Sequence, residues 1–417
     1  MRSLHTYLFV LLCWLMSASC ADHKEDPYHI DRKGISQEVL ENYLKRSVTM
    51  AEFLTVDPYC VDASYPAKED DIRLIENIGA KFIGRAIYRW GKEDVLNETG
   101  FLQNAERLVK AVHENDKDVV FEAAVFECIT TKVNTIKIPE WTFKALDLPV
   151  EDRNFRYDSM LNSKGVFVNH WGAGSSVPDI TRSETQLWMM FLAGTYIGIG
   201  CEAIHFGQID LIGMADNNYT QWSAFLDKLR QYAGDHARRN WILLDAHTPH
   251  GGMVVNGKSL LDFNAFPLRV KEVPEKPMEG VLEKGYLDAF FGRSKGCITP
   301  SGWSTDALPY LVELDNFGVS EKPGVADTTS HYTWGYDEIT WFYLQPEAYK
   351  KEWLWYAQRW INANDKTGYL EMPVSRLITR GQGLPVVKNR ANTPSPAVPD
   401  GLNIEETIKE IWQKESR

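Results

Sequence analysis

The sequence predicts a (β/α)8 barrel, a TIM-type α/β fold, and three observations support this prediction. Apolar, strand-like segments alternate with amphipathic helices over most of the chain. The strand-like segments are apolar on both faces, as expected of parallel strands covered by helices. Polar side chains follow several of these segments, where barrel enzymes build their sites. A doubly wound open sheet is the alternative, but the glycine-rich phosphate turn expected after its first strand is not visible.

An N-terminal helix is predicted over residues 36–54, ahead of the alternating part of the chain. Amphipathic spacing then marks the helices, most clearly in residues 68–79, where Ile72, Ile75 and Ile78 share one side. The expected strands are residues 54–64, 81–90, 119–128, 202–211, 241–247, 259–266, 310–317 and 368–372. The expected helices between them are residues 68–79, 101–115, 184–198, 221–238 and 346–362.

Three other segments carry local signals. Asn256 and Gly257 suit the type I′ turn of a β-hairpin leading into the sixth strand. Residues 270–303 fit the alternation least well and are a candidate for an extra strand pair. Residues 129–179 form a long loop insertion after the third strand, and loops of this size usually serve function. We therefore expect this insertion to roof a site.

The chain is expected to have four parts. Residues 1–19 have the pattern of a signal peptide, because a positive charge precedes a short apolar run that ends in small residues. Residues 20–53 are expected to hold a tether and a capping helix. Residues 54–388 are expected to form the catalytic barrel, and residues 389–417 a C-terminal tail with a short helix.

The small residues before Cys20 resemble the lipobox of bacterial lipoproteins, whose cysteine is lipidated. This resemblance implies an exported protein that a lipid on Cys20 anchors in the outer membrane. Residues 21–26 resemble the acidic tether that directs some lipoproteins of Bacteroidota to the cell surface. A cleaved secretory signal, which would give a periplasmic or secreted protein, is the alternative. The apolar run itself is too short to span a bilayer.

Composition and net charge limit the classes of binding partner that are expected. The 417 residues carry a formal charge of -12 and are 12% aromatic, which is typical of an acidic globular protein with a large core. Without a basic stripe, neither nucleic acid nor an anionic membrane surface is expected as the main partner. Membrane contact is expected only through the lipid anchor. Cys60, Cys128, Cys201 and Cys297 lack metal-ligand spacing, so buried thiols are the expectation, with a disulfide as the alternative.

Four polar pairs stand where strand-like runs give way to loops. Residues two apart in a strand share a face, so each pair aims two polar groups in one direction. Burying such groups without partners costs about 2 kcal/mol or more each, so their number indicates a pocket. The pairs are Gln208/Asp210, Asp245/His247, Asp262/Asn264 and Glu313/Asp315. Arg89, Glu127 and Glu371 stand at corresponding places in other strands.

Paired carboxylates facing each other across a cleft are the groups that glycosidic cleavage requires. Glu127 is the predicted general acid, because its neighbours in the sequence are apolar. A core ion pair with Arg85 or Arg89 is the alternative for this carboxylate. Asp315 and Asp262 both remain candidates for the nucleophile or base, and the sequence does not separate them.

The predicted substrate-binding groups suit the hydroxyls and ring faces of a sugar. Amides such as those of Gln208 and Asn264 both donate and accept hydrogen bonds, and Trp334 offers an aromatic plane. Asp337, beside Glu338, has a helix cap as its alternative role. The predicted set is Arg89, Gln208, Asp210, Asp245, His247, Asn264, Glu313, Trp334 and Glu338.

A metal site is the weaker prediction. Asp245, His247 and His250 form a conceivable ligand set, but the HxH and HExxH spacings typical of metal hydrolases are absent. Walker and GxSxG motifs are also absent. We therefore predict neither a metal nor a cofactor. Arginines such as Arg85, Arg89 and Arg182 suit a uronate or sulfated sugar, although internal ion pairs are favoured for them.

The mature chain resembles glycoside-hydrolase-like lipoproteins of Bacteroidota carbohydrate-degradation systems. The segments that carry this resemblance are residues 83–86, 203–208, 310–318 and 334–341. It implies a barrel and a carbohydrate substrate, but it assigns no catalytic pair. The Glu313 and Asp315 pattern departs from the Asn-Glu ending familiar on the fourth strand of the largest barrel-glycosidase clan. The expected function is hydrolysis of a polysaccharide or oligosaccharide; the alternatives are a noncatalytic surface carbohydrate-binding protein and a metal-dependent hydrolase.

Overall fold

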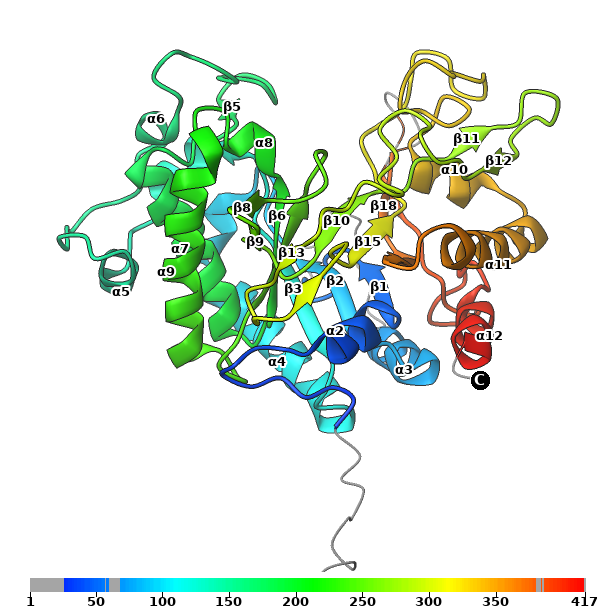
Figure 1. Cartoon of the computed structure of the whole chain (residues 1–417), viewed down its shortest axis with the longest axis horizontal. Coiled ribbons are helices and arrows are strands. Elements are labelled where there is room, and N and C mark those ends of the chain that lie inside the picture. Colours follow the sequence, from blue (N-terminus) through cyan, green and yellow to red (C-terminus); the bar gives the residue numbers. More distant parts are fainter. Residues whose placement is uncertain (1–25, 57, 60–67, 380–383, 385, 416–417) are drawn as a thin grey trace, which may run out of the picture.

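A ring of parallel strands forms the centre of the molecule (Figure 1). The computed structural model describes residues 26–56, 58–59, 68–379, 384 and 386–415. Nine strand segments pair in the order β16-β15-β10-β7-β6-β3-β2-β1-β17. β16 pairs with β15 and β17 pairs with β1, and only Glu371 separates these two segments, so together they act as one eighth strand that closes the barrel. The predicted (β/α)8 fold is confirmed.

The strands of the barrel are short and buried on both faces, as expected where helices cover a parallel sheet. They are β1 (Ser47–Met50), β2 (Phe82–Ile87), β3 (Val120–Ala124), β6 (Ala203–Gln208), β7 (Leu243–His247), β10 (Asn264–Pro267), β15 (Tyr310–Glu313), β16 (Gly368–Leu370) and β17 (Met372–Ser375). In Figure 1 their carboxyl ends point to the top of the view.

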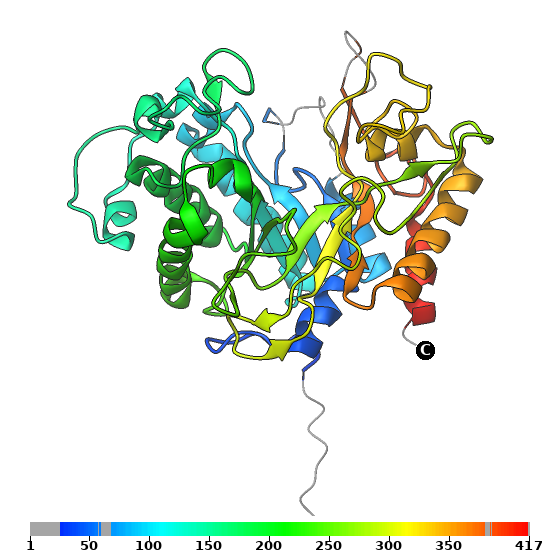
Figure 2. The ribbon, with the colours of Figure 1, turned by 45° about the horizontal axis from the view of Figure 1, so that its top comes forward.

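Helices surround this ring, and their apolar faces form the outer core (Figures 1 and 2). In α9, for example, Trp222, Phe225, Leu226 and Leu229 recur at helical spacing and are all buried. The long helices are α3 (Lys68–Ile78), α4 (Thr99–Asn115), α7 (Ser183–Gly198), α9 (Thr220–His236), α11 (Glu347–Asn364) and α12 (Glu405–Glu415). No helix in the described part of the chain is long and apolar enough to cross a membrane.

The amino end of the barrel is closed by α2 (Gln37–Leu44). A second apolar cluster unites Leu40, Tyr43 and Leu44 of this helix with the first residues of several strands, among them Phe82 and Val120. The strands are therefore sealed at this end by apolar packing.

The connection after β3 holds several short elements beside the carboxyl mouth (Figure 2). They are β4 (Ile129–Thr130), η2 (Thr131–Thr135), α5 (Glu140–Ala145), α6 (Tyr157–Met160) and β5 (Ser175–Ser176). Across the mouth lie α10 (Glu338–Leu344) and the antiparallel pair of β11 (Lys271–Glu272) and β12 (Gly280–Val281), an extra strand pair within residues 270–303 as expected.

The remaining short elements lie in loops and at the rim. They are η1 (Glu93–Asn97), α8 (Ile209–Ile212), η3 (Asn217–Tyr219), β8 (Val254–Val255), β9 (Lys258–Ser259), β13 (Cys297–Ile298), β14 (Ser304–Thr305), β18 (Leu377–Ile378) and β19 (Val387–Lys388). β8 and β9 form the predicted hairpin, and Asn256 and Gly257 between them have φ of 50° and 77°. Two consecutive positive φ values are the mark of a type I′ turn.

Two strand predictions were wrong. The first barrel strand is Ser47–Met50, within the helix predicted over residues 36–54, and residues 54–56, 58 and 59 of the predicted first strand are not strand. All four residues of β1 are buried, so they show no alternation to separate them from the buried helix face before them. The sixth strand begins only at Asn264, because residues 258–259 belong to the hairpin.

Several predictions at the ends of the chain lie outside the described residues. These are the signal peptide, the lipidated Cys20 and the acidic tether. Cys60 also lies outside them, whereas Cys128, Cys201 and Cys297 are buried and carry no disulfide.

The closed barrel predicts that the stability of the fold depends strongly on the buried residues of its strands. Ile204 of β6 is fully buried, and Ile204→Ala should lower the free energy of unfolding by about 2–5 kcal/mol, because it removes apolar contacts and leaves a cavity. Ile298→Ala is the matched control, since Ile298 is 41% exposed, and it should change stability by less than about 1 kcal/mol. Urea unfolding followed by circular dichroism measures both; equal losses would contradict the packing described.

Candidate active site

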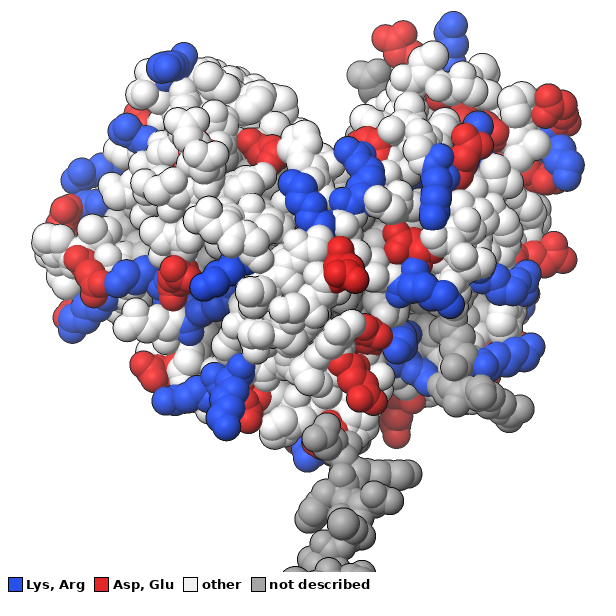
Figure 3. Space-filling view, viewed as in Figure 1, with Lys and Arg blue, Asp and Glu red and all other residues white. Residues whose placement is uncertain are grey.

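A cleft opens at the carboxyl end of the barrel. It consists of a cavity of about 480 Å³ and a neighbouring one of about 410 Å³. The residues that line both are Gln208, His247, Asp315 and Phe317. Because the two cavities share these walls, they form one continuous cleft. The surface is visibly hollowed between the connection after β3 and the segment that carries α10 (Figure 3).

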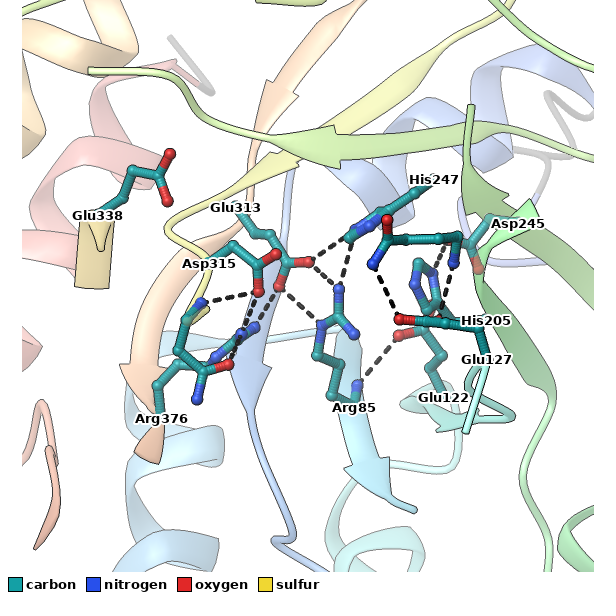
Figure 4. A network of polar contacts seen from close by, with 12 residues as sticks. Arg85, Glu122, Glu127, His205, Asp245, His247, Glu313, Asp315, Glu338 and Arg376 are labelled. Carbon is teal, nitrogen blue, oxygen red and sulfur yellow. Dashed lines mark hydrogen bonds and ion pairs between the residues drawn. The ribbon is translucent and has the colours of Figure 1, made fainter. Parts of the chain in front are cut away.

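Two arginines clamp one carboxylate in the floor of this cleft. Arg85 Nε donates to Glu313 Oε2 at 2.8 Å, and its Nη2 pairs with Glu313 Oε1. Arg376, just after β17, pairs with Glu313 through Nη1 and donates to Asp315 Oδ1 from Nη2 at 2.6 Å. Arg85 Nη2 also lies 3.1 Å from His247 Nε2. Figure 4 shows this network stretching across the barrel between β2, β7, β15 and the eighth strand.

A backbone irregularity aims Arg85 into the barrel. Arg85 has φ of 55° inside β2, and the register between β2 and β3 shifts between Ile83 and Ile87. Such a bulge re-aims side chains locally, and the left-handed conformation costs about 1–3 kcal/mol for a residue with a Cβ. The ion pairs of Arg85 with Glu313 are positioned to offset this cost.

The arginines fix the charge of both carboxylates. Burial alone would raise the pKa of Glu313, but Arg85 and Arg376 outweigh burial and hold this pKa well below its usual range. Burial and the charge of Glu313 would likewise raise the pKa of Asp315, yet Arg376 and Arg85 lower it overall. Both carboxylates are therefore negatively charged at neutral pH.

Glu127 stands on the other side of the cleft, in a different setting. Its Oε2 accepts a hydrogen bond from the backbone N–H of Gln208 at 3.0 Å, and its Oε1 accepts one from Gln208 Nε2, also at 3.0 Å. Among the described residues Glu127 forms no ion pair, so the predicted alternative of a salt bridge to Arg85 or Arg89 is wrong. Arg89 instead pairs with Glu52, at 3.3 Å.

Gly207 makes room for the Glu127 carboxyl group. Its φ is 54°, and a Cβ at this position would lie 2.1 Å from Glu127 Oε2. Both the backbone conformation and the close approach therefore favour glycine. The following residue, Gln208, is thereby turned so that its backbone N–H and its side chain both reach Glu127.

Aromatic side chains form the wall nearest Glu127. Trp90 is 39% exposed and packs edge-on against Trp171, with ring centroids 5.0 Å apart, and against Phe126 at 5.5 Å. Phe317, 40% exposed, lines the same cavity. The sequence reasoning missed Trp90, Phe126 and Trp171, although Trp90 closes a predicted strand and that position could have identified it.

The structure brings together most of the predicted site. Glu127, Arg89, Gln208, His247 and Asp315 line the larger cavity. Asp210 lines the smaller one, where His250 Nε2 lies 3.3 Å from its Oδ2. Glu313, Asp245 and Glu371 lie below, in the barrel interior. Arg376 and Asn316 also line the cleft and were missed, because they follow their strands without a distinctive pattern.

Asp262 and Asn264 do not join this group. β10 begins at Asn264, so this pair precedes the strand instead of ending it. Asp262 Oδ2 accepts hydrogen bonds from the backbone N–H of Leu244, at the start of β7, and from Arg230 Nη2, both at 2.9 Å. Asn264 Nδ2 donates to Ser294 Oγ at 3.1 Å. The prediction that this pair stands at a strand exit was wrong, because the sixth strand starts later than expected.

Trp334 and Glu338 are also held away from the cleft. Trp334 is 6% exposed and donates from Nε1 to the backbone oxygen of Glu279 at 2.7 Å, so it offers no free ring face. Glu338 pairs with Arg269 at 2.8 Å, and burial raises its pKa to about 8. Figure 4 shows it apart from the network. Asp337 accepts from the backbone N–H of Thr340, which confirms its alternative role as the cap of α10.

Two clusters have metal-ligand composition. Glu122, His205 and Asp245 form one, and His247, Glu313 and Asp315 form the other; in each, one ligand atom per residue lies within 4.8 Å of the others. In the second cluster the guanidinium groups of Arg85 and Arg376 contact the same oxygens that a cation would bind. These arginines already supply the positive charge there.

Comparisons with known proteins gave distant structural likenesses only. No protein-family model matches the sequence, and no curated protein matches it either. An acarbose-soaked debranching enzyme from Nostoc punctiforme is 10% identical, with a TM-score of 0.42, covering 89% of this chain and 81% of that one. A β-glucuronidase from Ruminococcus gnavus in complex with uronic isofagomine is 10% identical, with a TM-score of 0.40, covering 88% and 50%.

A third similar structure is an α-galactosidase from Thermus thermophilus, 13% identical, with a TM-score of 0.32, covering 58% of this chain and 48% of that one. The chain thus spans about half the length of the last two structures. All three names are those of glycoside hydrolases. At this distance the likenesses describe those proteins and carry no inference about chemistry here.

The clamp on Glu313 and Asp315 predicts a pH-dependent stability effect. Arg376→Met leaves the buried Glu313 and the partly exposed Asp315 each short of a partner and should lower the free energy of unfolding by about 3–5 kcal/mol at pH 7. In the folded protein the pKa values of both carboxylates are lowered. The stability that the arginine provides is therefore fully present above about pH 4, the pKa of these groups in the unfolded chain. It is lost as the pH falls through their folded-state pKa values. The deficit of the variant should therefore shrink on acidification. Denaturant unfolding at pH 7 and pH 3.5 tests this.

Arg107→Met, on an exposed part of α4, is the control and should behave as the wild type at both pH values. A deficit for Arg376→Met that stays constant with pH would show that its packing, and not its charge, stabilises the floor.

Proposed function

We propose that this protein is a glycoside hydrolase that cleaves a glycosidic bond in an oligosaccharide or polysaccharide. The observation that supports this best is that Glu127 and Asp315 line the same cavity from different sides of the barrel, after β3 and after β15. Two carboxyl groups across a cleft, in unlike electrostatic settings, are what acid-assisted glycosidic cleavage needs.

The different electrostatic surroundings of Asp315 and Glu127 suggest different catalytic roles. Asp315 is held charged by Arg376, so it suits attack on the anomeric carbon and stabilisation of an oxocarbenium-like transition state. Asp262, the other candidate from the sequence, lies at the amino end of β7 and is no longer part of the proposal.

Glu127 suits the proton-transfer role. Gln208 fixes both carboxyl oxygens with neutral donors, so the orientation of the group is set without a formal positive charge beside it. In this proposal the protonated carboxyl group of Glu127 gives its proton to the leaving glycosidic oxygen as the bond to the anomeric carbon breaks. The resulting carboxylate then takes a proton from the water that releases the sugar from Asp315.

The cleft walls supply groups for sugar binding. Trp90, Trp171 and Phe317 present aromatic surface, on which the apolar faces of a pyranose can pack. Gln208, His247 and Asn316 present groups that hydrogen-bond hydroxyls. Arg85, Arg89 and Arg376 each have a carboxylate partner, which favours neutral sugars over uronates or sulfated sugars.

Isosteric amides test the carboxylate pair directly. Glu127→Gln and Asp315→Asn should each lower kcat by about 10²- to 10⁴-fold on a glycan that the wild type cleaves, because each removes a group that acts in the transition state. The measurement is product release from a panel of plant, algal and host glycans, followed by kinetics on the best substrate. Glu106→Gln, on the exposed face of α4, is the matched control and should retain full activity.

The Asp262→Asn variant distinguishes Asp262 from Asp315, the two sequence-based candidates for the nucleophile or base. This variant should retain the activity of the wild type per folded molecule. Full activity in Glu127→Gln would remove that residue from the mechanism. A wild type that binds glycans but releases no product from any of them would support the noncatalytic carbohydrate-binding protein instead.

A further inference from the structure

A small chamber lies inside the barrel, beneath the cleft. Its volume is about 10 Å³, close to the space that one water molecule or one ion occupies. The lining residues are Arg85, Glu122, His205, Asp245, Ala265, Leu311, Glu313 and Glu371. Arg85 lines both the chamber and the cleft above it, so the chamber lies directly under the floor of the site.

The chamber lining contains buried polar atoms without partners. In the described part of the chain, His205 Nε2, Asp245 Oδ1 and Glu371 Oε1 have no hydrogen-bond partner. Their side chains are 2%, 1% and 4% exposed. Leaving such atoms unpaired costs about 1–3 kcal/mol each, so the two carboxylate oxygens beside one small space indicate a missing ligand.

His205 and Asp245 face the same space, because His205 Nδ1 lies 2.6 Å from Asp245 Oδ2. A neutral imidazole carries a lone pair on the ring nitrogen that holds no proton, so Nδ1 can bind a metal ion beside Asp245 while Nε2 keeps the proton.

The chamber also gathers three carboxyl groups. Glu122, Asp245 and Glu371 are buried around it, whereas the guanidinium contacts of Arg85 and Arg376 go to Glu313 and Asp315. Glu122 accepts a hydrogen bond from the backbone N–H of Arg85 at 3.0 Å, and its side chain is also in hydrogen-bonding contact with that of Asp245. Three buried carboxylates without a cation are costly in a low-dielectric interior. Either protons or a metal ion must offset them.

Gly84 leaves space for these oxygens. A Cβ at this position would lie 1.9 Å from Glu371 Oε1 and 3.4 Å from Glu122 Oε2. The two carboxylate oxygens therefore face the same space over the β2 backbone. Figure 4 shows Glu122, His205 and Asp245 gathered on one side of Arg85, with Glu313, Asp315 and Arg376 on the other.

We propose that this chamber binds one divalent first-row transition metal ion, such as Zn²⁺ or Mn²⁺, through Glu122, His205 and Asp245, with Glu371 as an additional oxygen donor. One ion satisfies the unpaired oxygens of Asp245 and Glu371 together and offsets two negative charges. A proton shared between Glu122 and Asp245 is the alternative occupant of this space. The mixed imidazole and carboxylate donors favour these metals over Ca²⁺, which prefers oxygen alone.

Metal content and thermal stability of the purified full-length protein test this proposal. The protein is stripped with a chelator, incubated with Zn²⁺, Mn²⁺, Mg²⁺ or Ca²⁺ in turn, and desalted. Elemental analysis should find about one Zn²⁺ or Mn²⁺ per chain, and that ion should raise Tm, because it binds only the folded state. Mg²⁺ and Ca²⁺ should give neither result.

Matched variants locate the ion. Asp245→Asn and Glu122→Gln should lose it, and Gly84→Ala should weaken its retention by crowding Glu371. Asp315→Asn, which changes the other carboxylate cluster, should retain it. These readouts do not depend on glycosidase activity, so the proposed function and the metal site can fail independently.

Absence of bound metal together with an unchanged Tm in the wild type would overturn the proposal and leave water or shared protons in the chamber. Loss of the ion in Asp315→Asn, with retention in Asp245→Asn, would move the site to the other cluster. If Asp245→Asn fails to fold, Glu122→Gln and the wild-type Tm shift still decide the question.

Discussion

The ion pairs of Glu313 with Arg85 and Arg376 are the interaction on which the rest of the site depends. They join β2, β15 and the end of the eighth strand across the barrel interior. A single buried carboxylate would be costly, but two guanidinium groups compensate it and also hold Asp315. The strand ends are therefore linked by charge as well as by backbone pairing, and the cleft above has a rigid, polar floor.

This floor makes the two sides of the mouth electrostatically different. On the side of β15, arginines keep Asp315 charged. On the side of β3, Glu127 is held by Gln208 through neutral donors. Gly207 and the left-handed Arg85 are local backbone features that permit this difference, the first by giving space and the second by redirecting a side chain. The chemistry proposed for the cleft depends on this asymmetry more than on any single residue.

Much of the fold could be predicted from the sequence, because apolar strands and amphipathic helices alternate with clear periods. β1 could not, since four buried residues carry no period of their own. Polar residues that end a correctly placed strand, such as Gln208 and His247, line the cleft. It failed at Asp262, where a hairpin displaced the strand start, and at Trp334, whose indole satisfies a backbone carbonyl in the interior.

The same reasoning explains why two residues of the chamber, Glu122 and His205, were overlooked. Glu122 and His205 lie within their strands, so a search of strand exits does not reach them. Inward-facing positions of a barrel are usually filled with apolar side chains, and a sequence pattern of period two does not show which face points inward. Only closure of the ring reveals that Glu122, His205, Asp245 and Glu371 share one space.

Arg85 connects the chamber with the cleft, and this gives the proposed metal ion a consequence for the site. The guanidinium group contacts Glu313 and His247 above, while the carboxylates of the chamber attract it from below. An ion in the chamber would neutralise most of that lower charge and leave the guanidinium group to the upper carboxylate. Because Arg85 also lowers the pKa of Asp315, an occupied chamber would favour the charged Asp315 that the proposed reaction uses. The charges in the chamber would then influence the ionisation of the reacting groups in the cleft above it, with Arg85 as the connection.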